Sequence, residues 1–228
     1  MLYFHGNSED VGSNVYFLMQ LREMFNISTL AMEYPGYGFF THSIVKGQQT
    51  QEKLSCSAKC ITTNAEIVIK HVIMSKQDGG MGIKPKNVII FGRSIGTGPA
   101  TYLASKFKVG GLIIMSPYTN IKNVAANVAG RVASWFISSH FDNATAMKSV
   151  RSPVLLLHGA MDTLIPSTHS EELWKILHDQ KKQKTLNDFA HLDNSQIYLH
   201  PRMTHNDFNL MNDILRPIEK FLNQIYQS

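Results

Sequence analysis

Three side chains that could together perform nucleophilic catalysis are spread along the sequence: Ser94, Asp162 and His205. A serine hydroxyl is a poor nucleophile at its ordinary pKa, so it needs a base beside it, and that base needs an acid to orient it. Ser94 lies in GRSIG, which matches G-x-S-x-G, a pattern typical of a nucleophilic serine on a sharp turn between a strand and a helix. In proteins with this turn the chain order is serine, acid, histidine, as it is here.

The residues around Ser94 favour this interpretation over an ordinary strand-to-helix connection. The apolar run NVIIF (87–91) comes before it, and apolar residues recur at helical spacing over 100–107. Side chains at Gly92 and Gly96 would collide across such a turn, which explains the two glycines. A P-loop is excluded because its lysine is missing, and the spacing of a dinucleotide-binding loop is not matched. Pro99 removes a backbone donor early in the helix, and the sequence offers no reason for it.

The acid and the base are both expected in loops that follow strands. Asp162 comes just after the apolar run PVLLLH (153–158), where open α/β sheets place their sites, although a helix-capping aspartate would look the same. His205 lies in PRMTHNDF, between the last short strand and the last helix, and is the preferred base. The rivals are His200, which belongs to the last strand, and His191, which precedes it. His5 and His158 each end a strand before a glycine and are expected to pack or hydrogen-bond locally instead of acting as bases.

Two backbone amides are expected to stabilise the oxyanion that forms when a serine attacks a carbonyl group. One is the amide of Ile95, directly after the nucleophile, at a helix start whose dipole favours negative charge. The other should come from the loop after the first strand, FHGNSED, where Gly6 allows a close approach of the backbone. Asn7 is the preferred donor in this loop and Ser8 is the alternative.

These residues require an alternating α/β framework to position them. Short apolar runs predict strands at 2–4, 27–33, 87–91, 111–115, 153–158 and 196–200. Most are continuously apolar, which is typical of parallel strands with both faces buried. Helices are predicted over 11–25, about 50–75 and 206–226, so the expected fold is a mostly parallel sheet of about six strands with helices on both faces. A single domain, 1–228, is expected, in which 117–152 forms a small cap or crossover helices.

Composition excludes several other classes of protein. The 228 residues are 43% apolar with a formal net charge of +5, which suits a globular domain, and no nucleic-acid-binding motif is present. No apolar run is long enough to cross a membrane, and the N-terminus lacks the pattern of a signal peptide. Cys56 and Cys60 have no matching ligand pair, so reduced thiols are expected instead of a disulfide or metal site. A cytoplasmic protein is expected, with a mildly basic surface compatible with peripheral contact to membranes.

The motifs HGN, GRSIG, HGAMD and THND, in this order, resemble those of the α/β-hydrolase superfamily along nearly the whole chain. GRSIGTGPA followed by MSPYTNI is similar to the branch of α/β-hydrolase-domain proteins that includes acyl-protein thioesterases removing palmitate. The resemblance implies a triad of Ser94, Asp162 and His205, with oxyanion donors at Asn7 and Ile95. It also implies the strand order 2-1-3-4-5-6, with two N-terminal strands of the family fold missing before the first.

By this resemblance the chain is expected to be a serine hydrolase that cleaves carboxylic acyl esters or thioesters through an acyl-enzyme, without metal or cofactor. Small-molecule, lipid and acylated-protein substrates are all compatible with it. Trp135, Phe136 and Ile137 either line an acyl pocket or pack a helix against the sheet. A peptidase with the same triad and a noncatalytic binding protein of the same fold are the alternatives.

Overall fold

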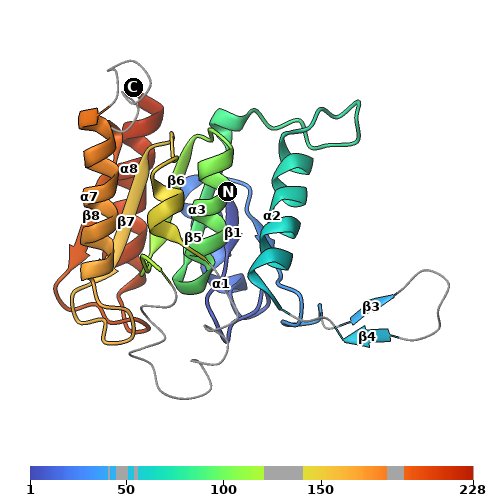
Figure 1. Cartoon of the computed structure of the whole chain (residues 1–228), viewed down its shortest axis with the longest axis horizontal. Coiled ribbons are helices and arrows are strands. Elements are labelled where there is room, and N and C mark those ends of the chain that lie inside the picture. The colour runs from blue at the N-terminus through green and yellow to red at the C-terminus, as the bar shows by residue number, and fades with distance from the viewer. Residues whose placement is uncertain (41, 45–50, 54–55, 121–140, 184–192, 228) are drawn as a thin grey trace.

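The computed structural model describes residues 1–40, 42–44, 51–53, 56–120, 141–183 and 193–227 (Figure 1). Its main sheet has six parallel strands in the order β2-β1-β5-β6-β7-β8. Numbered by their order along the chain, these strands lie as 2-1-3-4-5-6, which confirms the predicted sheet and the α/β fold. The strands are β1 (Leu2–Phe4), β2 (Leu30–Met32), β5 (Ile89–Arg93), β6 (Gly111–Met115), β7 (Val154–Gly159) and β8 (Gln196–His200).

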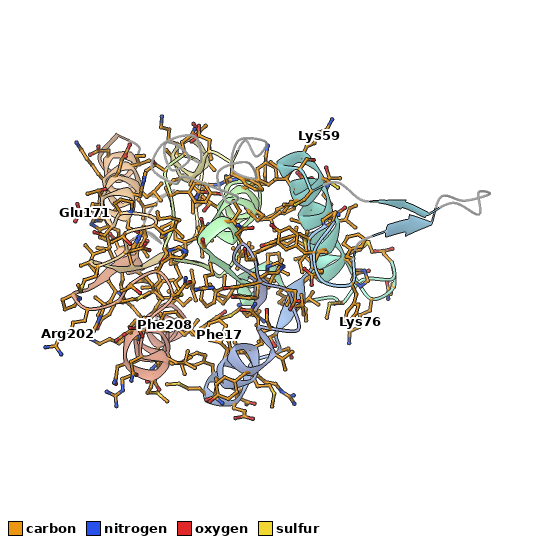
Figure 2. The ribbon with its side chains drawn as sticks, turned by 90° about the horizontal axis from the view of Figure 1, so that it is seen from below. Phe17, Lys59, Lys76, Glu171, Arg202 and Phe208 are labelled. Carbon is orange, nitrogen blue, oxygen red and sulfur yellow. The ribbon has the colours of Figure 1, made fainter. Side chains whose placement is uncertain are left out.

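Helices cover both faces of this sheet. They are α1 (Val15–Phe25), α2 (Ala58–Ile73), α3 (Thr97–Lys106), α6 (Asn143–Met147), α7 (Thr168–Gln183) and α8 (Arg216–Gln227). Shorter turns are the 3₁₀ turns η1 (Pro85–Asn87) and η2 (Ser94–Gly96), and the π-helix η4 (Leu210–Leu215). One face packs against α2, α3, α6 and α7, and the other against α1, η4 and α8 (Figures 1 and 2).

The continuous apolar runs arise because both faces of the strands are buried. Successive side chains of a strand point to opposite faces, so Ile90 joins the core under α2 and α3 while its neighbour Phe91 joins the core under α1 and α8. In Figure 2, Phe17 of α1 and Phe208 lie on the α8 side of the sheet, where both pack against the core under α1 and α8. Because all six strands are parallel, their C-terminal ends lie together at one edge of the sheet.

The predicted helix over about 50–75 is wrong at its start. Gln51–Lys53 is strand β4, which pairs antiparallel with β3 (His42–Ile44), and this hairpin projects from the body in both figures. Helix α2 begins at Ala58 because the Ser57 hydroxyl accepts a hydrogen bond from the Cys60 amide and caps the first turn. The helical apolar spacing therefore holds only from the cap onward.

The predicted helix over 206–226 also begins late. Residues 206–209 form a loop, and the helical run starts as the π-helix η4 before continuing as α8 to Gln227. The reason is a reciprocal cap: the Asn209 side chain accepts from the Asn212 amide, and the Asn209 amide donates to the Asp213 carboxylate. The strand predicted over 27–33 is likewise shorter, because only Leu30–Met32 pairs with β1.

Two further features bear on where ligands could bind. A largely apolar cavity of about 750 Å³ lies at the N-terminal ends of β1 and β5, beside β2, and none of the predicted site residues lines it. Because none of the predicted site residues lines this cavity, the predicted chemistry must be sought at the other edge of the sheet, where the strands end. Among the residues that the structure describes, no helix is both long and apolar enough to cross a membrane.

Candidate active site

Ser94 lies on the turn between β5 and α3. Its φ is +52°, in the left-handed region that residues other than glycine seldom adopt, and the 3₁₀ turn η2 begins with it. A Cβ on Gly92 would overlap the carbonyl oxygen of Gly96, and a Cβ on Gly96 would overlap that of Phe4. Because backbone cannot give way as a flexible side chain can, this turn accepts only glycine at these two positions.

Packing explains the TGP sequence that follows the turn. Pro99 is the third residue of α3, where backbone N–H groups have no acceptor within the helix, so its missing N–H breaks no bond of α3. The Ile95 carbonyl, which lies before α3, accepts a hydrogen bond from the Tyr118 hydroxyl at 3.3 Å. The same hydroxyl leaves no room beside Gly98, where a Cβ would collide with it. The proline that the sequence left unexplained is therefore tolerated because it stands in the first turn of α3, where no bond within the helix is lost.

The structure brings Ser94, His205 and Asp162 together at the C-terminal edge of the sheet. His205 Nδ1 lies 2.7 Å from Asp162 Oδ2, and His205 Nε2 lies 3.0 Å from Ser94 Oγ. A carboxylate can only accept, so Nδ1 carries the proton and donates it to Asp162. This leaves Nε2 to accept the hydrogen bond of the serine hydroxyl, which is the arrangement a general base needs. All three side chains are buried.

Asp162 is held as a carboxylate by its neighbours. Burial on its own would raise the pKa of Asp162, but hydrogen bonds from His158 and His205 and from the Ile165 amide outweigh it and hold the pKa well below its usual range. The amides of Leu164 and Ile165 donate to Oδ1 at 3.0 and 2.8 Å, and His158 Nε2 lies 3.3 Å from Oδ2. One oxygen therefore faces the backbone and the other faces the two histidines.

This lowered pKa predicts a pH dependence of stability. Because the folded-state pKa of Asp162 lies below the unfolded value of about 3.9, its contribution is fully present above that value and is lost as the pH falls toward the folded pKa. Between pH 4 and 2, the free energy of unfolding should fall more steeply in the wild type than in Asp162→Asn, by up to about 1.4 kcal/mol per pH unit. Urea unfolding at stepped pH measures both slopes, and equal slopes would contradict the assignment.

The histidines not preferred as the base have other partners where the structure describes them. His5 Nε2 lies 2.9 Å from Glu33 Oε1, and His200 Nε2 lies 3.1 Å from Asp213 Oδ1. His191 lies outside the described residues. Among the residues that are described, His205 is the histidine hydrogen bonded to Ser94, which agrees with its preferred place in the loop after β8.

The two expected oxyanion donors leave the sheet from neighbouring strands, because β1 pairs with β5. Ile95 is the second residue of η2, so its amide is among those at a helix start that have no acceptor within the helix. Asn7 lies in the loop after β1, and its side-chain oxygen accepts a hydrogen bond from the Tyr37 hydroxyl at 2.7 Å. Ser8, the alternative, has a φ of +61° and turns the chain immediately after Asn7.

Sequence reasoning missed a charged pair next to the site. Arg93, the residue before Ser94, forms an ion pair with Glu9 of the loop that carries Asn7. An arginine beside Ser94 was visible in GRSIG, but its spacing gave no indication of its partner. His158 was expected to pack or hydrogen-bond locally, and its ring nitrogens lie 2.7 Å from Ser170 Oγ and 2.8 Å from the Ile165 carbonyl oxygen. Its contact with Asp162 was missed.

The segment expected to form a cap or an acyl pocket is described only at its ends. Residues 121–140, with Trp135, Phe136 and Ile137, lie outside the described residues, so their role stays a prediction. On either side of that segment, Asn120 and Asp142 pair as an isolated antiparallel bridge. The chain therefore leaves and re-enters the described structure at one place, between β6 and α6.

Comparisons with known proteins agree with this fold. The family model described as phospholipase/carboxylesterase matches residues 46–200. Human alpha/beta hydrolase domain-containing protein 17B is 29% identical over 175 residues, which are 77% of this chain and 54% of that protein. The chain thus spans about half the length of the curated relatives it matches.

Solved structures share the architecture at low sequence identity. An esterase of Pyrococcus furiosus superposes with a TM-score of 0.68 at 14% identity, covering 99% of this chain and 81% of that one. A puromycin-hydrolysing peptidase of Mycobacterium tuberculosis gives 0.70 at 14% identity, covering 100% of this chain and 34% of that one. These likenesses establish the fold alone, whereas the family model covers most of the sequence. The chain therefore belongs to the phospholipase/carboxylesterase family of α/β-hydrolases.

Proposed function

We propose that this chain is a serine hydrolase that cleaves carboxylic acyl esters or thioesters, with Ser94 as nucleophile, His205 as base and Asp162 as orienting acid. The observation that carries the proposal is the unbroken hydrogen-bond chain from Asp162 through His205 to Ser94, with both contacts at 3.0 Å or less. The position of Ser94 on a strained turn at the end of a buried strand also supports the proposal, because such a turn presents the serine oxygen at the edge of the sheet.

The reaction has two halves. The Ser94 oxygen attacks the acyl carbonyl carbon while its proton passes to His205 Nε2, and the amides of Ile95 and Asn7 donate to the resulting oxyanion. The bond to the leaving oxygen or sulfur then breaks, and the leaving group takes the proton from Nε2. Water attacks the acyl-enzyme in the second half, with His205 again accepting a proton and returning it to Ser94 as the carboxylic acid departs.

The substrate class follows from the family and from the leaving group that this machinery can release. The matched family is described as phospholipase/carboxylesterase, which supports acyl groups on lipids or small alcohols. Thioesters, including acyl groups on protein cysteines, present the same carbonyl to the same nucleophile and are included in the proposal. Peptidase activity is ranked below acyl hydrolysis because the matched family is described as phospholipase/carboxylesterase.

A panel of matched substrates tests this proposal. Oxygen esters and thioesters with the same acyl group, in short, medium and long chains, should be hydrolysed, and aminoacyl p-nitroanilides should not. An amine is a much poorer leaving group than a phenol or thiol, so anilide cleavage would need additional recognition of the amine. Preferential cleavage of the anilides would instead support a peptidase, and no turnover of any substrate would support a noncatalytic protein.

A further inference from the structure

Arg93 lies between the two loops that must meet over Ser94. It is the last residue of β5, and its side chain is 13% exposed. One end of the guanidinium, Nη1, pairs with Glu9 Oε1. The other end, Nη2, donates to the His205 carbonyl oxygen at 3.2 Å and to Asn206 Oδ1 at 2.9 Å. A single side chain therefore contacts both the loop after β1 and the loop after β8.

Glu9 continues the connection to the proposed oxyanion donor. Its second oxygen, Oε2, accepts from the Gly6 amide at 2.9 Å and from Asn14 Nδ2 at 3.2 Å. Gly6 directly precedes Asn7, so the carboxylate fixes the peptide group next to the one whose amide would face the oxyanion. Through Glu9, Arg93 is thus connected to the Gly6 amide in the loop after β1, just before Asn7.

The contacts require an arginine. Its planar fork can donate along two edges at once, whereas the ammonium of lysine is a point charge that cannot reach both loops in the same way. Burial lowers the pKa of Arg93, yet a guanidinium stays charged in proteins, so Glu9 supplies the countercharge that a desolvated cation needs. The Arg93 Cζ also lies 5.8 Å from the ring centroid of Phe208, labelled in Figure 2, which adds a third contact to the loop after β8.

We propose that Arg93 and Glu9 are positioning residues for acyl hydrolysis: their ion pair holds the loop with Asn7 and the loop with His205 in register over Ser94. The inference rests on the function proposed above. The two loops are brought together only by tertiary structure, and the pair links them directly beside the nucleophile. A small displacement of either loop would misalign the oxyanion donor or the base, and such misalignment is costly in rate.

The test compares steady-state kinetics of Arg93→Met and Glu9→Gln on a small p-nitrophenyl ester, well below the melting temperature of each variant. Each single variant should lower kcat by about 10- to 100-fold with KM changed less than about twofold, because geometry is lost and ground-state binding is not. The double variant should be no slower than the slower single, since both changes break one connection. Arg93→Lys should keep most of the thermal stability but not recover kcat.

Lys70→Met provides a matched control, because it breaks the Lys70–Glu66 ion pair on α2, away from the site. This variant should keep the wild-type kcat. The proposal is overturned if folded Arg93→Met and Glu9→Gln retain wild-type kcat, or if Arg93→Lys restores it fully.

Nuclear magnetic resonance separates this inference from the proposed function. In both single variants, the imidazole signals of His205 and the amide signal of Gly6 should move together, because one connection holds both. If the wild type hydrolyses no ester, the proposed function fails, and the link between the loops is then judged by these signals alone. Signals that stay in place, or that move in only one loop, would refute the link.

Discussion

Replacing Ser94 with alanine is expected to abolish covalent labelling by a fluorophosphonate and to lower ester turnover by at least about 10³-fold. The probe reacts only with a serine that a base has activated, and Ser94 Oγ is the hydroxyl hydrogen bonded to His205 Nε2. Alanine keeps the Cβ at a position where φ is already +52°, so the backbone of the turn has no new strain to accommodate. The loss should therefore be chemical and should leave the melting temperature nearly unchanged.

Ser116 is the matched control for this experiment. It follows β6 directly, its φ is +48°, and it is as buried as Ser94. In the sheet, Arg93 pairs with Met115, so the two serines leave neighbouring strands at the same level. The Ser116 hydroxyl is buried without a hydrogen-bond partner among the described residues, so no base activates this serine. Ser116→Ala should therefore leave the labelling unchanged. Labelling that survives Ser94→Ala, or that disappears in Ser116→Ala, would show that Ser94 has been wrongly assigned as the nucleophile.

The second large effect is expected in Asp162→Asn, which should lower kcat by about 10⁴-fold although it changes no heavy-atom position. The amides of Leu164 and Ile165 donate to Oδ1, so the asparagine oxygen must remain there to accept them. Its NH₂ group is then forced to the place of Oδ2, facing His205 Nδ1. A donor at this place makes Nδ1 the acceptor and moves the ring proton to Nε2, which can then no longer accept from Ser94.

Histidine variants complete this test. His205→Ala should depress turnover by orders of magnitude, as removal of a general base does. His200→Ala provides the comparison, because that histidine is the last residue of β8, just before the loop with His205, and pairs with Asp213. It should retain nearly the full rate. An inactive His200→Ala together with an active His205→Ala would show that the base has been misassigned.

The sheet could be predicted from sequence because its signal is local and strong. Short, largely apolar runs marked β6 and β8 with their observed bounds, and the alternation of strands and helices indicated a parallel sheet. The observed strand order was implied by the resemblance to α/β-hydrolases. The helix starts were predicted less well. The caps at Ser57 and Asn209 depend on particular side-chain hydrogen bonds, and the apolar spacing alone extends past both of them.

The arrangement of the candidate site was predictable only in part. Each triad residue could be assigned to a loop after a strand, because parallel strands all end at one edge. The link from Glu9 through Arg93 to the His205 loop could not be predicted, since it joins segments separated by more than a hundred residues and depends on side-chain geometry. The contact of His158 with Asp162 joins residues only four positions apart, and it could not be predicted because it depends on side-chain geometry.

The hydrogen bond from Tyr118 to the Ile95 carbonyl has a consequence for how the chain folds. The Ile95 carbonyl, directly after Ser94, accepts this bond from a residue 23 positions later, beyond β6. A fragment that ends before Tyr118 cannot form the bond, and closing so long a loop costs entropy that only the packed sheet offsets. The turn that carries Ser94 is therefore completed only when the domain folds cooperatively, and activity recovered after denaturation would report assembly beyond β6 and not merely a formed helix.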